Sequence, residues 1–471
     1  MNTKDKAKGN FLESYFQLKE HNTNIKTEIL AGFTTFITMA YALLVIPNIL
    51  KASGMNSLGL MGDAANGLNT MNDPVVGAAF VAMCIVSAIG TLIMSLYGNL
   101  PFAVAPGIGL TAFFTYSVCL TLGYTWQQGL AAVTISGLLF VTITVTSLRE
   151  KIVECLPKNI KVAMTAGIGL FVALIGLKSG GIVVADPGTL VRFGNFTDKN
   201  VLLTIIGLAI MCVLMVRKVK GAMLISILAT TIIGIPMGIT QVAGLKILSA
   251  PTSIMPTFMK MDFQGLFAHN GNGIVGAITS IIMVVFTFSL VDLFDTLGTL
   301  VGTAQRAEMI QPDGKIRNMR KALLTDAIST TFGSMFGMTT TSTYIESAAG
   351  IAEGGRTGLT TLVVGVLFAA SVFLGGIVGI VPAQATAPAL IVVGVLMMES
   401  IKDVNFSDLS EAVPAFLTIA LMPFTYSIAN GIAAGIIFYP IMKVAVGKYK
   451  EVHPITYILA VLFVLRFMMI Q

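Results

Sequence analysis

Apolar runs of about 20 residues recur from Lys26 to the C-terminus of this 471-residue chain, and each is long enough for a helix to cross a bilayer core. Charged residues make up only 11% of the sequence, whereas soluble domains carry roughly 25%. No polar stretch between the runs is long enough to fold separately. We therefore predict a single all-α polytopic membrane domain, and no soluble domain.

The apolar runs divide into about seven plus seven segments. In the first half they fall near 27–49, 75–97, 101–120, 127–146, 159–178, 200–216 and 221–239. In the second half they fall near 273–302, 321–337, 338–352, 358–380, 387–402, 410–425 and 429–446. Because each half has an odd number of segments, homologous halves would enter the membrane in opposite orientations, as an inverted repeat.

This division predicts five parts of the chain. They are a cytoplasmic N-terminal arm (1–26), a first inverted repeat (27–240), an extracytoplasmic connection (241–272), a second inverted repeat (273–447) and a C-terminal hydrophobic extension (448–471). The run from 456 to 470 is short and carries Arg466, so the sequence leaves open whether it spans the membrane or lies at its surface.

The net charge of +6 is explained by topology rather than by an acidic partner. With the N-terminus in the cytoplasm, the clusters of Lys and Arg between segments all fall on the cytoplasmic side of the cell (inner) membrane. The N-terminal arm has no apolar stretch before a small-residue cleavage site, so we do not expect a signal peptide. No loop carries the dense basic patch that phosphate binding needs, which excludes nucleic acid as a partner.

Two short matches between the halves support an internal repeat. YGNLPF at 97–102 resembles FGSMFG at 332–337, and GLAAVTISGLLF at 129–140 resembles GLTTLVVGVLF at 358–368. Chance matches are common in apolar sequence, so either one alone is weak evidence. Their corresponding order in the two halves makes the pair stronger.

Two segments, the third and the tenth, cannot be uninterrupted helices. Pro106 removes a backbone donor and disfavours helix at Ala105, while the stretch 338–346 is rich in hydroxyl and β-branched side chains. We expect a short extended strand followed by a half-helix in each. A helix start at the bilayer midplane presents backbone N–H groups and a positive dipole end to a polar ligand.

The candidate site residues lie on these half-helices and in the eighth segment. The alignment of YGNLPF with FGSMFG sets Thr111 opposite Glu346, facing a shared cavity. In FSLVDLFDTLGTLVG, the spacing of three and four puts Asp292, Asp295 and Thr299 on one helix face. Carboxyl groups at this depth are costly unless they are paired, protonated or facing water, so they indicate a functional site.

A further acid, Asp326, lies in the ninth segment, whereas none of the three histidines lies in an apolar segment. A proton relay would therefore use carboxyl groups, whose pKa burial raises towards neutrality. Asp292, Asp326 and Thr299 are the candidates for proton coupling. Carboxylate and hydroxyl oxygens also bind sodium, which leaves a sodium-coupled carrier as the alternative. We expect no metal site and no cofactor other than the coupling ion.

Four ordered motifs resemble the adenine–guanine–hypoxanthine permeases, the AzgA-like branch of the nucleobase–ascorbate transporter superfamily. They are FTTFITMAYALLVIPNIL, APGIGLTAFFTY, VDLFDTLGTLVG and TSTYIESAAGIAEGGRTGLT, and the resemblance runs from about residue 10 to the end. It implies fourteen segments arranged as a core domain (one to four, eight to eleven) and a gate domain (five to seven, twelve to fourteen). It also implies a transporter, not an enzyme, with a homodimer as its assembly.

The resemblance assigns Asp295 and Glu346 to substrate binding and matches Asp326 to a functional acid. Thr343 and Ser347, in the same tenth-segment motif, are further candidate contacts. Thr111 departs from the asparagine expected in the third-segment motif, so the substrate range does not carry over directly. A carboxylate suits the two adjacent donors of guanine and the single donor of hypoxanthine, while adenine would need a protonated carboxyl or another partner.

Three other functions compete with proton symport of purines. An anion transporter of the same fold would place a cation or only helix dipoles at the site, and the acids argue against it. A membrane enzyme would need an aqueous loop or a His or Cys cluster near the D-x-x-D motif, and the sequence has neither there. A channel would not need acids suited to carrying a proton.

Overall fold

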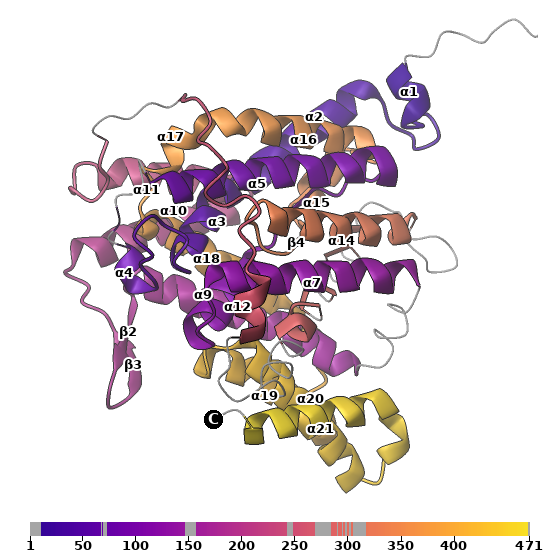
Figure 1. Cartoon of the computed structure of the whole chain (residues 1–471). Helices are drawn as coiled ribbons and strands as arrows, with labels where there is room; N and C mark the ends of the chain where they lie inside the picture. The colour runs from indigo at the N-terminus through magenta and orange to yellow at the C-terminus, as the bar shows by residue number, and fades with distance from the viewer. Residues whose placement is uncertain are drawn as a thin grey trace, which may run out of the picture.

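The computed structural model describes residues 11–66, 68, 73–146, 157–242, 248–268, 284–289, 291–293, 295–296, 299–300, 303–304 and 317–469. Figure 1 shows α5, α7 and α14 running side by side, with α1 beyond one end of the bundle and the β2–β3 hairpin at the other. Among the described residues, eight helices are long and apolar enough to span a membrane. The prediction of a predominantly helical polytopic protein is confirmed.

The long helices of the first half follow the predicted segments, and shorter elements lie within or between them. They are α1 (Phe11–Tyr15), α2 (Ile25–Met39), α3 (Ala42–Lys51), α4 (Asp63–Asn66), α5 (Pro74–Ile93), η2 (Met94–Gly98), β1 (Val104–Pro106), α6 (Ile108–Ala112), η3 (Phe113–Thr121), α7 (Trp126–Val145), α9 (Lys158–Ser179), β2 (Val183–Asp186), β3 (Leu190–Phe193), α10 (Lys199–Val216) and α11 (Ala222–Gly234).

The remaining elements also match the predicted order. They are α12 (Phe263–Ala268), α14 (Met319–Met335), β4 (Thr341–Thr343), α15 (Ser347–Ala352), α16 (Gly358–Ser371), η4 (Val372–Leu374), α17 (Gly375–Val378), α18 (Ala383–Met398), η5 (Glu399–Asp403), α19 (Leu409–Phe424), α20 (Ile428–Ala445), η6 (Tyr449–Glu451) and α21 (Pro454–Met469). The eighth predicted segment is described only in part, from residue 284 to residue 304.

Local capping fixes where several spans begin. At the start of α5, the carboxylate of Asp73 accepts hydrogen bonds from the backbone N–H groups of Val75 and Val76, and Pro74 occupies the first helical position. At the start of α7, Thr125 and Gln128 form a reciprocal capping box. These signals are local in sequence, which is why the segment positions could be predicted closely.

The first span is bent between α2 and α3. The turn at Ala40 and Tyr41 separates the two helices, and Pro47 lies inside α3. Pro47 removes one helical hydrogen bond and crowds the carbonyl of Leu43, so its effect falls inside α3, after the turn. The bend leaves Tyr41 between the two helices.

One sheet was not predicted. Strands β2 and β3 form an antiparallel hairpin between the fifth and sixth segments, with Val183 paired to Phe193 and Asp186 to Leu190. The carboxylate of Asp186 accepts hydrogen bonds from the N–H groups of Gly188 and Thr189, and so forms the turn. The hairpin projects from the bundle at the end opposite α1 (Figure 1).

The C-terminal extension forms a helix, α21, that packs against α20. Phe463 is buried, and its ring centroid lies 6.3 Å from that of Phe286 in the eighth segment. The helix has 16 residues, fewer than the about 20 of a typical span. The extension therefore belongs to the helical bundle rather than forming a detached tail.

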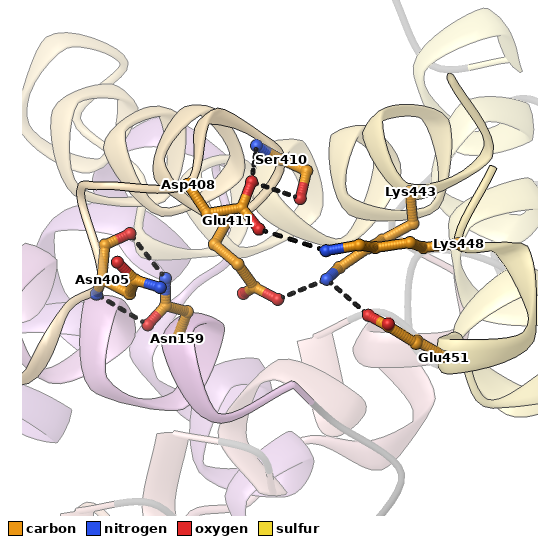
Figure 2. Close-up of polar contacts among 8 residues, drawn as sticks. All are labelled: Asn159, Asn405, Asp408, Ser410, Glu411, Lys443, Lys448 and Glu451. Atoms are coloured by element: carbon orange, nitrogen blue, oxygen red, sulfur yellow. Dashed lines mark hydrogen bonds and ion pairs between the residues drawn. The ribbon is translucent and has the colours of Figure 1, made fainter. Parts of the chain in front are cut away.

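A polar cluster joins the ends of α9, α19 and α20 to the start of the extension (Figure 2). The ammonium group of Lys443, which is almost fully buried, forms ion pairs with Glu411 at 2.7 Å and Glu451 at 2.9 Å. Asn159 and Asn405 exchange hydrogen bonds between α9 and the segment that leads into α19. The cluster fixes these helices to one another at one end of the bundle.

The two acids beside Lys443 should contribute unequally to stability. The Glu411 side chain is 19% exposed and that of Glu451 is 53% exposed, so solvent screens the second pair more. Breaking a buried ion pair costs about 3 kcal/mol or more when the remaining charge has no other partner. Because Glu451 still pairs with Lys443, we expect Glu411→Ala to lower the free energy of unfolding by at most about 3 kcal/mol. Glu451→Ala should lower the melting temperature less.

Thermal unfolding of the detergent-purified variants measures this difference. The hydrogen bond from Lys443 holds the pKa of Glu451 below its usual range. The Glu451–Lys443 pair therefore contributes fully to the free energy of unfolding above the ordinary carboxyl pKa, and this contribution is lost as pH falls through the lowered pKa. Equal melting shifts for the two variants would contradict the ranking.

Candidate functional site

The two predicted extended strands pair with each other at the centre of the site. Strand β1 runs antiparallel to β4, with Val104 opposite Thr343, Ala105 opposite Ser342 and Pro106 opposite Thr341. All six residues are buried. Because every backbone polar group inside a membrane needs a partner, the pairing of the two interrupted segments explains how both extended pieces are tolerated there.

Each strand leads directly into a short helix. Gly107 precedes α6 and Glu346 precedes α15, and neither helix start has a side-chain cap. The N–H group of Gly107 donates to the carbonyl oxygen of Thr340, which joins the start of α6 to the chain entering β4. The predicted strand and half-helix in the third and tenth segments are confirmed.

Glu346 is held by the first span. The Tyr41 hydroxyl donates a hydrogen bond of 2.7 Å to Glu346 Oε1. Thr38, one turn earlier, has its hydroxyl 3.5 Å from the Glu346 carbonyl oxygen. The bend between α2 and α3 therefore positions a donor that orients this carboxyl group.

Asp295 lies on the face of β4 that carries Ser342. The Ser342 hydroxyl is hydrogen-bonded to the Asp295 carboxyl group. A Cβ atom at Gly107 would lie 2.9 Å from Ser342 Oγ and 3.6 Å from Asp295 Oδ2, so a larger residue would displace the Ser342 hydroxyl. Asp295 and Glu346 interact electrostatically with each other and with Tyr344. The structure thus brings together the two acids that sequence assigned to substrate binding.

Thr111 has a different environment from the one expected. Its hydroxyl contacts the carbonyl oxygen of Gly107 at 2.7 Å and the hydroxyl of Thr339 at 2.8 Å, and the residue is fully buried. The side chain therefore connects α6 to the strand entry of the tenth segment instead of pairing across a cavity with Glu346. Thr111 and Glu346 occupy corresponding positions in the two repeats, but this correspondence does not require the two side chains to be in contact.

The two other predicted contacts are also part of the framework. Ser347 Oγ accepts a hydrogen bond of 3.0 Å from the N–H group of Ala103, so it ties α15 to the start of β1. Thr343 is buried, and its position two residues after Thr341 puts both on the same face of β4. Ser342, between them, faces Asp295.

Asp292 and Asp326 form a second acidic group. The Thr296 hydroxyl lies 2.7 Å from Asp326 Oδ2 and 3.5 Å from Asp292 Oδ1. Thr341 donates to the Asp326 carbonyl oxygen at 3.2 Å, so this group adjoins the opposite face of β4 from Asp295. The predicted coupling acids are close together, and one strand separates them from the predicted substrate acid.

Thr299 forms a hydrogen bond within its own helix. Its hydroxyl donates to the backbone oxygen of Asp295 at 2.8 Å, one helical turn earlier. Such a bond satisfies the hydroxyl within its own helix.

Three residues with direct contacts at the site were missed by sequence reasoning. They are Tyr41, which orients Glu346, Ser342, which contacts Asp295, and Tyr344, whose hydroxyl donates to the Pro106 carbonyl oxygen at 2.6 Å. A tyrosine within an apolar segment was the available signal, because a buried phenol needs a hydrogen-bond partner. Ser342 could be separated from Thr343 only once the register of β4 was known.

The arrangement offers two carboxyl groups beside paired backbone strands, with hydroxyl donors around them. In the described part of the chain, no group of three or more His, Cys, Asp or Glu residues could hold a metal ion. A ligand with adjacent hydrogen-bond donors matches such a site, because ionised carboxylates accept and do not donate.

Comparison with known proteins identifies the family. The Permease family model matches residues 26–434. The chain belongs to this family. It is 46% identical over 457 residues to a protein of Methanocaldococcus jannaschii described as a permease, covering 97% of this chain and 98% of that one. The nucleobase–ascorbate transporter family indicated by the sequence motifs is thereby confirmed, and the chain is a multi-pass membrane permease rather than an enzyme.

Two relatives carry more specific names. The adenine permease AdeP of Escherichia coli (strain K12) is 41% identical over 460 residues, covering 98% of this chain and 96% of that one. The guanine/hypoxanthine permease PbuO of Bacillus subtilis (strain 168) is 41% identical over 457 residues, covering 96% and 99%. The equal identities do not distinguish one kind of purine from the other.

A solved structure confirms the fold. The transmembrane domain of the cyanobacterial bicarbonate transporter BicA superposes with a TM-score of 0.60 at 16% identity, covering 88% of this chain and 97% of that one. The seven-plus-seven inverted repeat predicted from the segment count is therefore the fold of this permease. At this level of identity, the likeness concerns the fold alone.

The contact between Tyr41 and Glu346 leads to a testable expectation. Tyr41→Phe keeps the ring and removes the donor, so uptake at low substrate concentration should fall roughly tenfold, which is about 1.4 kcal/mol. Tyr15→Phe is the control, because its hydroxyl donates to the Leu96 carbonyl oxygen far from the acids in sequence. Initial uptake rates in whole cells measure the effect, and equal rates in both variants would contradict it.

Proposed function

We propose that this permease imports purine nucleobases by proton symport, with guanine and hypoxanthine preferred and adenine as a further substrate. The observation that carries this proposal is the pair Asp295 and Glu346, which are both half-buried and interact electrostatically beside the β1–β4 ribbon. Import by alternating access in the inner membrane, with the N-terminus in the cytoplasm, is part of the proposal.

The chemistry of the acids supports a purine substrate. A carboxylate accepts two hydrogen bonds from the N1–H and exocyclic amine of guanine, or one from the N1–H of hypoxanthine. The names of the relatives, adenine permease and guanine/hypoxanthine permease, support the same class. Charge-assisted bonds of this kind are roughly twice as strong as neutral ones, so a few suffice for recognition.

The second acidic group supports proton coupling. Asp292 and Asp326 are 2% and 0% exposed, and the Thr296 hydroxyl lies between them. Two close buried carboxyl groups are stabilised when they share a proton, which makes the group a suitable carrier of the coupling ion. Both acidic groups adjoin strand β4, so the proposed coupling acids and the proposed substrate acid contact the same structural element.

Two alternatives share the same fold. Sodium would bind the same carboxylate and hydroxyl oxygens, and an anion would need a cation at the site. The acids at the described site argue against an anion substrate, because both would repel it.

Uptake assays test the proposal and separate the alternatives. Radiolabelled guanine, hypoxanthine and adenine are supplied to cells that lack their own purine carriers, with and without a protonophore and with sodium omitted. We expect accumulation that collapses with the protonophore and is unaffected by sodium. Loss of uptake when sodium is omitted would instead favour sodium coupling, and no uptake of any purine would refute the function.

A further inference from the structure

A polar cavity separate from Asp295 and Glu346 lies at the end of the bundle opposite the N-terminal arm. The first span begins next to that arm at Ile25 and ends at Lys51, which lines the cavity. The cavity has a volume of about 630 Å³, and neither Asp295 nor Glu346 lines it. Its polar lining comes from the segments leading into α10 and α18 as well as from α3.

Lys51 is the unusual member of this lining. The residue is only 3% exposed, and within the described part of the chain its ammonium group has no ion pair or hydrogen bond. Asp73 attracts it electrostatically, but both oxygens of that carboxylate already accept hydrogen bonds from Ser57, Val75 and Val76. The helix dipole favours a cation in the last turn of α3 but supplies no acceptor in the cavity. The Lys51 ammonium group therefore reaches the cavity from a buried side chain without a protein acceptor, which favours a ligand that supplies one.

A second positive feature faces the same cavity. Ala383 and Gln384, the first residues of the 16-residue helix α18, line it, and Pro382 provides no side-chain cap. The first N–H groups of a helix lack intrahelical partners and carry the positive end of its dipole. Lys51 and the start of α18 together favour hydrogen-bond acceptors on a ligand.

The cavity also offers an acceptor. Asp198 lines it, and one oxygen of its carboxylate caps α10 by accepting a hydrogen bond of 2.8 Å from the N–H group of Asn200. A ligand that fits must therefore present acceptors towards Lys51 and a donor towards Asp198. A 6-oxopurine has O6 and N7 as acceptors on one side and N1–H as the adjacent donor. Adenine keeps the acceptor at N7, but it has an amine donor in place of O6 and an acceptor at N1, so two of the three groups are mismatched.

We propose that this cavity is an outer binding site for the nucleobase that selects 6-oxopurines over adenine before they reach Asp295 and Glu346. This inference rests on the proposed function as a purine permease. Tyr41, which holds Glu346, lies ten residues before Lys51 on the same span, about 15 Å along a helix axis. The first span therefore connects the outer site, at Lys51, with the inner site, at Tyr41. An adenine amine that faces Lys51 would leave polar groups of the site unpaired, which disfavours adenine.

Binding measurements in a variant without the inner site test the proposal. Purified Glu346→Ala protein is titrated with radiolabelled hypoxanthine, with unlabelled adenine as competitor. We expect a weak saturable component that adenine displaces at least tenfold less well than guanine does. Adding Lys51→Met should remove this component, and adding Lys51→Arg should retain it, because arginine keeps the charge and the donors.

Lys199→Met in the same background is the matched control. Lys199 lines the same cavity but is exposed, so its removal changes the net charge equally without removing a buried donor. We expect less than a threefold effect. Replacing a buried cation by methionine is generally tolerated in folding, and gel filtration and melting of each variant check this.

The outcomes separate the two proposals. No residual binding in Glu346→Ala, a residual component insensitive to Lys51→Met, or equal losses in the Lys51 and Lys199 variants would each overturn the outer site while leaving the permease function intact. Wild-type protein that neither binds nor transports any purine would refute the proposed function, and the outer site with it.

Discussion

Glu346→Ala is expected to weaken purine binding at the inner site at least about a hundredfold while leaving expression and folding intact. Two hydrogen bonds to an ionised carboxylate contribute roughly 1.5 kcal/mol or more each, so their loss amounts to about 3 kcal/mol or two orders of magnitude in Kd. The side chain precedes α15 and is held by Tyr41, and no helix or strand depends on it for a cap. Equilibrium binding of radiolabelled guanine to the purified variant measures the loss.

Glu353→Ala is the matched control for this substitution. Glu353 follows the other end of α15 and forms an ion pair with Lys220 at the protein surface. Glu353→Ala removes one negative charge from the other end of the same short helix and leaves the site unchanged. Exposed ion pairs contribute little to stability, so the fold should be retained. Unchanged affinity in Glu346→Ala, or an equal loss in both variants, would remove Glu346 from the substrate site.

Much of the architecture could be predicted because membrane insertion imposes strong local rules. The predicted segment 159–178 is α9 (Lys158–Ser179), and the predicted segment 200–216 is α10 (Lys199–Val216). Pro106 with Gly107 marked the first half-helix, because proline and glycine interrupt helices wherever they occur. These signals need no knowledge of tertiary contacts.

The site contacts were less predictable, because they depend on how distant segments meet. Glu346 is held by Tyr41, 305 residues earlier, through a bend whose direction is not encoded by Pro47 alone. The choice between Ser342 and Thr343 depends on the register of β4, and a shift of one residue would exchange their faces. Thr111 contacts Thr339 rather than its counterpart in the repeat. The acids could be named from sequence, but their hydroxyl partners could not.

The β2–β3 hairpin shows a different limit. Its strands are four residues each and lie between two predicted spans, and the apolar pattern that dominates this sequence marks membrane helices rather than short strands. The turn signal was present in Asp186 and Gly188, whose local hydrogen bond closes the hairpin.

Asp295→Asn should retain the fold and lose uptake. The amide has nearly the shape of the carboxyl group and can still bond to Ser342, so the packing beside Gly107 is preserved. It carries no charge and accepts through one oxygen only, so each charge-assisted bond to the base weakens. We expect accumulation to fall at least about tenfold, corresponding to one such bond.

Thr303→Val is the matched control in the same segment, because its hydroxyl bonds only to the backbone oxygens of Thr299 and Leu300 among the described contacts. If Asp295 binds the base, Asp295→Asn should also reduce exchange of internal for external base, which needs binding but no net proton movement. If Asp295 instead carried the coupled proton, exchange would persist while uphill uptake failed. Undiminished uptake would exclude both roles, so the two assays together decide whether the acid on the Ser342 face of β4 belongs to the substrate or to the coupling ion.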